Sequence, residues 1–184
     1  MVATTRTTPR HSVPQQLLDD AQTLLARCGA TDEGFQAIGS LLRSLARRPE
    51  ITGLIEAHEP YALIFDSLVL ASHDLGPTLI LRRIPSGRPT PEPVGLSWGI
   101  ACVVKGRNRF TTWRKDRPDG DLVRVGEVDL TPGDFVYFHV PPRNFHSEQG
   151  IGGPSWELVL SGQHLTARDD IAFDVAGDQL ELAS

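Results

Sequence analysis

The feature that most constrains the fold is a change of pattern at Pro60. Before Pro60, apolar residues recur at helical spacing. After it, short runs of Val, Ile, Leu and Phe alternate with turns rich in Gly, Pro and Asp. Short apolar runs bounded by such turns indicate β-strands, and many of them at regular spacing favour a barrel or a sandwich. The sequence therefore predicts one mainly β domain that follows a helical layer.

The segment before Pro60 predicts two helices and a third, shorter one, over residues 14–28, 33–48 and 51–57. Gly29 stops the first helix, Thr31 or Asp32 caps the second, and Pro49 ends it. We interpret residues 1–13 as a disordered tail and 14–58 as a helical extension that packs on a β-barrel formed by 60–184. Strands are expected over 61–65, 68–72, 78–84, 97–105, 107–115, 122–130, 134–140, 157–161 and 171–175.

Composition excludes several classes of function. The chain has 184 residues, with 18 Lys and Arg against 23 Asp and Glu, so a nucleic-acid partner is not expected. It has no apolar run long enough for a membrane span, and its polar N-terminus does not match a signal peptide. Cys28 and Cys102 lie on different predicted elements, so no disulfide framework is implied, and we expect a cytoplasmic protein.

Five short motifs follow one another in the β region. They are Pro85-Ser86-Gly87, Ser97-Trp98-Gly99, Val103-Val104-Lys105-Gly106, Leu130-x-Pro132-Gly133-Asp134, and Pro141 with His146. In this order they resemble the cupin superfamily, and they are most similar to its cysteine dioxygenase-like branch, also called thiol dioxygenase-like. The resemblance covers about residues 61–175. It implies a double-stranded β-helix, or jelly-roll barrel, and a homodimer.

The resemblance also implies that the family's metal site is degenerate here. Pro93 and Gly95 stand where the family has His-x-His, while His146 matches the third histidine. Three imidazoles can hold a divalent metal with open positions for substrate, and one imidazole cannot. We therefore expect no cofactor. The alternative is Fe(II) or another divalent metal on a rebuilt ligand set of His146, His139 and Glu92.

Four residues are candidates for catalysis. The family geometry would direct His146 into the barrel, where an imidazole suits general acid/base work, although it could also be a relic that only hydrogen-bonds there. Glu92 precedes the lost ligand pair, and Glu148 would share a strand face with His146. Tyr137 shares a strand face with His139, so these two side chains would line the cavity or pack behind it. For both carboxylates the competing interpretation is a solvated loop residue.

Candidate substrate-binding residues are Arg143, Arg82, Arg83, Trp98 and His139. Arg143 could clamp a carboxylate or phosphate, or form a surface ion pair. Arg82 and Arg83 alternate on one strand, so one of them must point inward and needs an anionic partner, which hints at an acidic substrate. Trp98 would fill the core or stack on a planar ligand.

Three functions remain open at this point. The first is a metal-independent cupin enzyme that acts on a small polar or anionic metabolite, with His146 as acid/base in a dehydration, isomerisation or cyclisation. The second is a non-catalytic protein that binds a small molecule or a partner. The third is a divergent metal-dependent, dioxygenase-like cupin with the rebuilt ligand set.

Overall fold

The computed structural model describes residues 12–59, 67–73, 76–87, 98–115, 122–138 and 145–162, and everything below concerns these residues. It contains three helices, namely α1 (Val13–Cys28), α2 (Asp32–Ala46) and α3 (Pro49–His58). All three were expected. Thr31 caps α2, because its side-chain oxygen accepts a hydrogen bond from the backbone of Gly34. Pro49 follows α2 and also opens α3, where its fixed φ suits the first helical turn.

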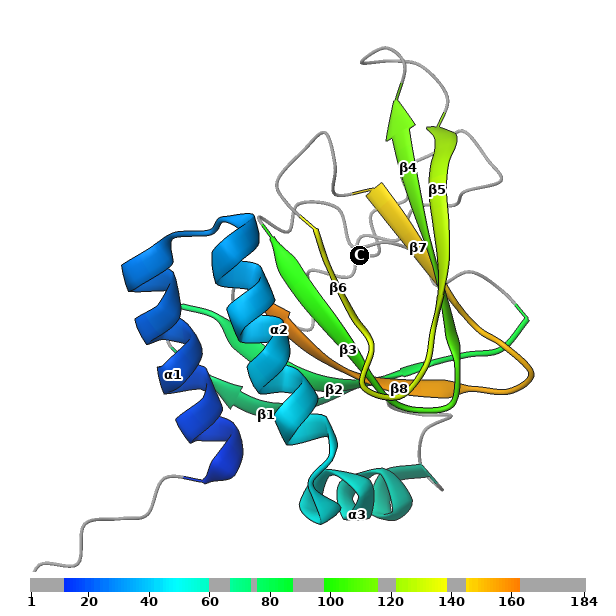
Figure 1. Cartoon of the computed structure of the whole chain (residues 1–184). Helices are drawn as coiled ribbons and strands as arrows, with labels where there is room; N and C mark the ends of the chain where they lie inside the picture. The colour runs from blue at the N-terminus through cyan, green and yellow to red at the C-terminus, as the bar shows by residue number, and fades with distance from the viewer. Residues whose placement is uncertain are drawn as a thin grey trace, which may run out of the picture.

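The strands form two antiparallel sheets (Figure 1). The five-stranded sheet has the order β1-β2-β8-β3-β6, with β1 (Ser67–Ser72), β2 (Thr78–Ile84), β8 (Ser155–Ser161), β3 (Gly99–Lys105) and β6 (Phe135–Phe138). The three-stranded sheet has the order β5-β4-β7, with β5 (Leu122–Leu130), β4 (Asn108–Lys115) and β7 (Phe145–Gly150). The predicted class, mainly β with an N-terminal helical extension, is confirmed. Over the described residues the strands remain two sheets and do not close into one barrel.

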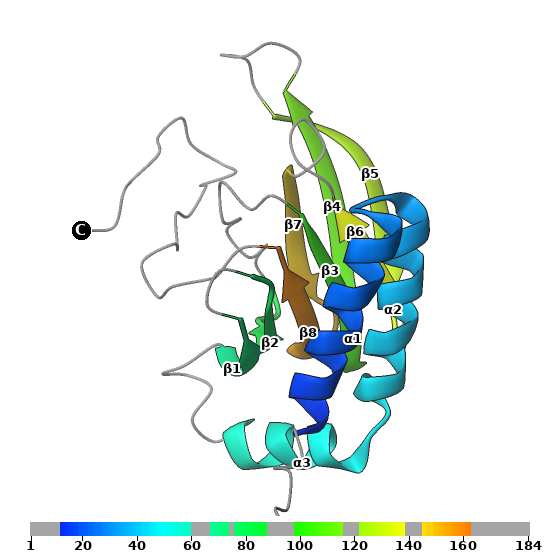
Figure 2. The same ribbon diagram turned by 90° about the vertical axis from the view of Figure 1, so that its left-hand side faces the viewer.

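Helices α1 and α2 cover the outer face of the five-stranded sheet (Figures 1 and 2). The apolar stripe of α2, including Phe35, Ile38 and Leu42, is fully buried. It belongs to the largest core cluster, together with Leu81 of β2 and Leu158 of β8. This cluster places the main core between the helices and one face of the sheet, which leaves the opposite face for the site.

Strand alternation divides the residues of the five-stranded sheet between its two faces. On β2, Leu79 and Leu81 join the core under the helices, whereas Ile80 packs with Ala101 and Val159 in a separate cluster on the other face. Arg82 lies two residues beyond Ile80, so it shares the face directed away from the helices. We call this the inner face of the sheet.

The strands are close to those expected from the sequence, with one omission. The bounds of β2 and β5 agree with the prediction, but β7 was not predicted. The sequence Phe-His-Ser-Glu-Gln-Gly has no run of branched apolar residues, which is the signal that marks a strand. The expected strands at 61–65 and 171–175 lie outside the described residues, as do residues 1–11 of the expected tail. The division into tail, extension and barrel stays a prediction.

Candidate functional site

The site is a cluster of polar side chains buried on the inner faces of both sheets. Arg82 comes from β2, Glu157 from β8, Asn108 from β4, and Glu148 and His146 from β7. Arg82 and Glu157 are paired directly across β2 and β8, and Phe110 pairs with Glu148 across β4 and β7. The strand registers therefore fix which polar side chains meet.

Arg82 bridges the two carboxylates. Its Nε donates to Glu157 Oε1 at 3.0 Å, and its Nη2 donates to the same oxygen at 2.5 Å and also to Glu148 Oε2. The Arg82 side chain is 17% exposed, against 2% for Glu148 and 1% for Glu157. Sequence reasoning expected one inward arginine with an anionic partner. The structure supplies both partners from the protein, so Arg82 is not an argument for an acidic substrate.

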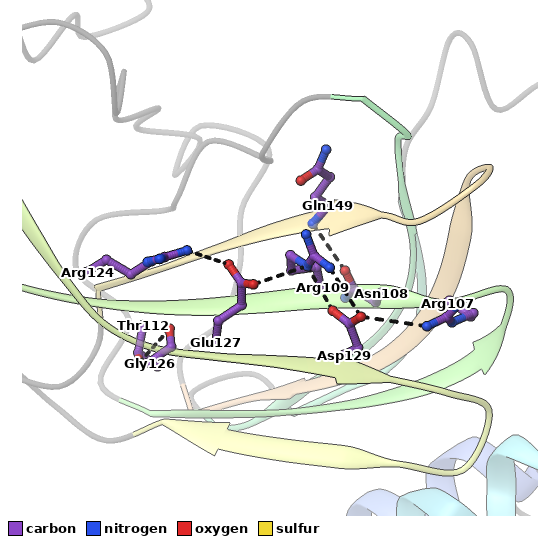
Figure 3. A network of polar contacts seen from close by, with 9 residues as sticks. All are labelled: Arg107, Asn108, Arg109, Thr112, Arg124, Gly126, Glu127, Asp129 and Gln149. Carbon is purple, nitrogen blue, oxygen red and sulfur yellow. Dashed lines mark hydrogen bonds and ion pairs between the residues drawn. The ribbon is translucent and has the colours of Figure 1, made fainter.

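Asn108 extends the cluster to the second sheet. Its Nδ2 donates to Glu157 Oε2 at 3.1 Å. Its Oδ1 accepts from the backbone N–H of Gln149 at 3.1 Å (Figure 3). Asn108 is fully buried. Glu157 thus receives donors from both sheets, which holds its carboxyl group in one place.

The cluster holds two carboxyl groups and one guanidinium. Burial, followed by the nearby charge of Glu148, raises the pKa of Glu157 to about 8 against the opposing effect of Arg82. Burial alone would lower the pKa of Arg82, but Glu148 and Glu157 raise it above its ordinary value. With Arg82 charged, one proton on the carboxyl pair makes the group neutral. At neutral pH we therefore expect Glu157 to carry that proton.

His146 lies beside this cluster. Its Nε2 is 3.8 Å from Glu148 Oε1, and the two side chains are 6% and 2% exposed. The imidazole stacks on Phe110 at a ring-centroid distance of 4.9 Å and contacts Phe138 at 4.3 Å. The predicted shared strand face of His146 and Glu148 is thus observed, and Glu148 is buried rather than a solvated loop carboxylate. A proton gained by His146 would be stabilised by the adjacent carboxylate.

Three other candidates lie away from His146. Tyr137 and Trp98 pack against Phe35 under the helices, with ring centroids 5.5 Å and 5.3 Å from the Phe35 ring. Of the two expected placements, Tyr137 therefore packs behind the site, and Trp98 contributes to the core. Arg83 follows Arg82 on β2 and so points to the opposite face. The candidates Glu92, His139 and Arg143 lie outside the described residues.

Sequence reasoning missed Glu157 and Asn108. Glu157 is the only charged residue in the apolar run Trp156-Glu157-Leu158-Val159-Leu160, and a lone carboxylate in a buried strand requires a partner. Arg82 likewise requires a partner of opposite charge if it points inward, so the sequence could have suggested that Arg82 and Glu157 form an ion pair. Asn108 lies in a basic turn sequence, and nothing in the sequence distinguishes it from a solvated hairpin residue.

The described donors do not fit a divalent metal. Among the residues that the structure describes, no group of three or more His, Cys, Asp or Glu side chains could hold an ion. His146 is flanked by two phenylalanine rings, and the guanidinium of Arg82 already bonds to both carboxylates. A divalent cation at those oxygens would be repelled by Arg82. The alternative ligand set of His146, His139 and Glu92 stays a prediction, because His139 and Glu92 lie outside the described residues.

Comparison with known proteins gives similarity to solved structures alone. No protein-family model and no curated protein matches the chain. It is similar to a cupin superfamily protein from Desulfitobacterium hafniense DCB-2, with 18% identity, a TM-score of 0.40, and coverage of 53% of this chain and 76% of that one. The cupin domain of Schizosaccharomyces pombe Cnp3 is 14% identical to this chain, with a TM-score of 0.41 and coverage of 53% of this chain and 60% of that one. Hydroquinone 1,2-dioxygenase from Sphingomonas sp. TTNP3, with 4-hydroxybenzoate bound, is 10% identical, with a TM-score of 0.43 and coverage of 55% of this chain and 67% of that one.

Two of these three solved structures are named as cupins, and the activity of none is transferred to this chain. The cysteine dioxygenase-like branch stays a prediction from the sequence motifs. In the part of the chain that the structure describes, no helix has the length and apolar character that crossing a bilayer requires.

Proposed function

We propose that this chain is a metal-independent cupin enzyme that acts on a small polar metabolite by acid/base chemistry, with His146 as the acid/base. The observation that supports this most directly is the pairing of His146 with Glu148 on the inner face of β7, at 3.8 Å and buried from solvent. Proton transfer of the dehydration, isomerisation or cyclisation type needs no redox centre and suits an imidazole.

In this proposal each described residue has a separate role. His146 takes or gives the proton, and Glu148 stabilises the imidazolium that forms in between. Arg82 keeps Glu148 in place through its Nη2, while Phe110 and Phe138 fix the plane of the ring. Because the donors of Arg82 already bond to two carboxylates, these residues favour an uncharged polar substrate over an anionic one.

The test is proton exchange followed by NMR. Purified protein in D2O, with a chelator present, is incubated with a panel of small hydroxy, keto and enol metabolites. We expect at least one compound to exchange a carbon-bound proton or to be converted. We expect His146→Gln to lower that rate by about 100-fold or more, in line with the contribution of general acid/base groups.

The control for this test is Tyr137→Phe, because Tyr137 packs under the helices and should leave the rate unchanged. Conversion that is equal in wild type and His146→Gln would place the chemistry elsewhere. Compounds that bind but never exchange a proton would instead support the second function, a non-catalytic binding protein. The self-contained pairing of Arg82 with Glu148 and Glu157 is compatible with that outcome.

A further inference from the structure

A hollow of about 380 Å³ lies at the end of the three-stranded sheet where β4 begins and β7 ends. Hollows of this volume are large enough to hold a small-molecule ligand. Two strands and two turns form its walls, which include Ser86, Gly87, Arg109, Gln149, Gly152 and Gly153. None of these residues belongs to the buried cluster around His146, so the hollow is a second place where a ligand could bind.

The two turns are held together beside the hollow. The backbone N–H of Gly150 donates to the carbonyl oxygen of Pro85 at 2.9 Å, which ties the end of β7 to the end of β2. Gly87 and Gly152 have φ angles of 85° and 72°, which residues with a side chain rarely adopt. A Cβ added at either glycine would meet no atom within 4 Å beyond its chain neighbours. The turns therefore leave open space that a ligand can enter.

Arg109 and Gln149 reach the hollow from the outer face of the three-stranded sheet. Their neighbours Asn108 and Glu148 point to the inner face, so strand alternation directs Arg109 and Gln149 to the opposite one. The two residues are paired directly across β4 and β7, and their side chains lie next to each other (Figure 3). On its other side Arg109 is paired with Asp129 of β5.

Asp129 fixes the orientation of the Arg109 guanidinium. Arg109 Nε donates to Asp129 Oδ1 at 2.8 Å, and Nη2 donates to Oδ2 at 3.2 Å, so both bonds use one edge of the group. A guanidinium has five N–H donors, so its Nη1–Nη2 edge keeps donors for a second planar partner. The Arg109 side chain is 39% exposed, which lets a ligand reach that edge.

The rest of the lining is polar but uncharged. Among the residues that the structure describes, the side-chain amide of Gln149 and the hydroxyl of Ser86 form no hydrogen bond. Both are available to a hydroxyl or carbonyl group of a ligand. The carboxylates of Asp129 and Glu127 lie on the other side of Arg109, at 2.8 Å and 3.5 Å from its Nε. They would repel a doubly charged ligand more than a singly charged one.

We propose that this hollow binds a small carboxylic acid as its monoanion. The carboxylate bonds to the Nη1–Nη2 edge of Arg109, while Gln149 and Ser86 bond to a hydroxyl or carbonyl group of the same molecule. Phosphate is disfavoured because of its second charge. This site and the one around His146 share no residue, so either can exist without the other.

The test is an NMR titration of the full-length ¹⁵N-labelled protein with lactate and, separately, with pyruvate. We expect a Kd of about 1 mM for at least one of them, as suits one charge-assisted pair with two neutral hydrogen bonds. The shifted signals should be the side-chain N–H groups of Arg109 and Gln149 and the backbone N–H of Gly152. Lactamide, the neutral analogue of lactate, and inorganic phosphate should both bind about tenfold more weakly.

Variants at the hollow show whether its side chains hold the acid. Arg109→Gln should weaken binding by about tenfold or more, and Gln149→Leu by about fivefold, in line with charge-assisted and neutral hydrogen bonds. Arg124→Gln is the control, because it makes the same change at a 61% exposed arginine of the same sheet face, outside the hollow. It should bind as wild type does. The same spectra show whether each variant is folded.

Several results would overturn the proposal. These are no binding of either acid below about 20 mM, equal affinity for lactamide, tighter binding of phosphate, or an equal loss of affinity in Arg109→Gln and Arg124→Gln. His146→Gln separates this site from the proposed acid/base site. It should leave the affinity for the acid unchanged, and a loss there would place the acid beside His146 instead.

Discussion

Arg82→Met is expected to destabilise the fold by about 3–5 kcal/mol, because removing one partner of a buried ionic group leaves the other charge uncompensated. The substitution keeps much of the apolar stem of Arg82 but removes the donors to Glu148 and Glu157, which are 2% and 1% exposed. The measurement is urea-induced unfolding at pH 7, compared with wild type.

Arg83→Met is the matched control, since Arg83 is the next residue of β2 and points to the opposite face. We expect its effect to stay within about 1 kcal/mol, as for most partly exposed substitutions. Adding Glu148→Gln and Glu157→Gln to Arg82→Met should recover part of the lost stability, because the buried charges are then gone. Equal effects of Arg82→Met and Arg83→Met would show that the buried ionic cluster does not form.

The second large effect concerns the pH dependence of stability. The pKa of Glu157 is raised from an ordinary 4.5 to about 8. Between these values the folded state keeps a proton that the unfolded state has lost, so the stability that this group contributes is fully present below pH 4.5 and is lost as the pH rises to about 8. The slope is at most about 1.4 kcal/mol per pH unit. Because Glu148 and Glu157 share Arg82, the titrating proton belongs to the pair.

Glu157→Gln should remove this pH dependence. The amide is neutral at every pH and leaves Arg82 paired with Glu148 alone. Unfolding free energies measured by urea from pH 5 to pH 9 should therefore decline in wild type and change much less in the variant, which should be the more stable protein at pH 9. Glu127→Gln, an exposed carboxylate of β5, controls for loss of an acidic side chain. Parallel curves for wild type and Glu157→Gln would contradict a raised pKa at Glu157.

Local patterns in the sequence were sufficient for much of the fold. The stripe that contains Phe35 and Ile38 and the cap at Thr31 located α2. The run of apolar residues in β2, bounded by turn residues, located that strand. Strand β7 was not predicted, because its inward residues are His146 and Glu148, whose burial depends on partners in β2 and β4. Periodicity reports apolar faces, so a strand that buries polar residues carries no such signal.

The candidate site was predictable only where neighbours in sequence are neighbours in space. His146 and Glu148 share one strand face at a spacing of two, which the sequence shows directly. The pairing of Arg82 with Glu157 joins residues far apart in the chain and depends on the β2–β8 register. The position of Tyr137 behind the sheet depends likewise on α2, which covers that face. The sequence left both arrangements open.

His146 lies beside buried protein charges, and we expect no metal ion to bind there. Metal content measured by mass spectrometry on tag-free protein tests this most directly, after reconstitution with Fe(II), Mn(II), Ni(II) or Zn(II) and with His146→Ala in parallel. We expect far less than one equivalent of any metal and no difference between the two proteins. Near-stoichiometric metal that is lost in His146→Ala would contradict it, and would direct the search for further ligands to Glu92 and His139.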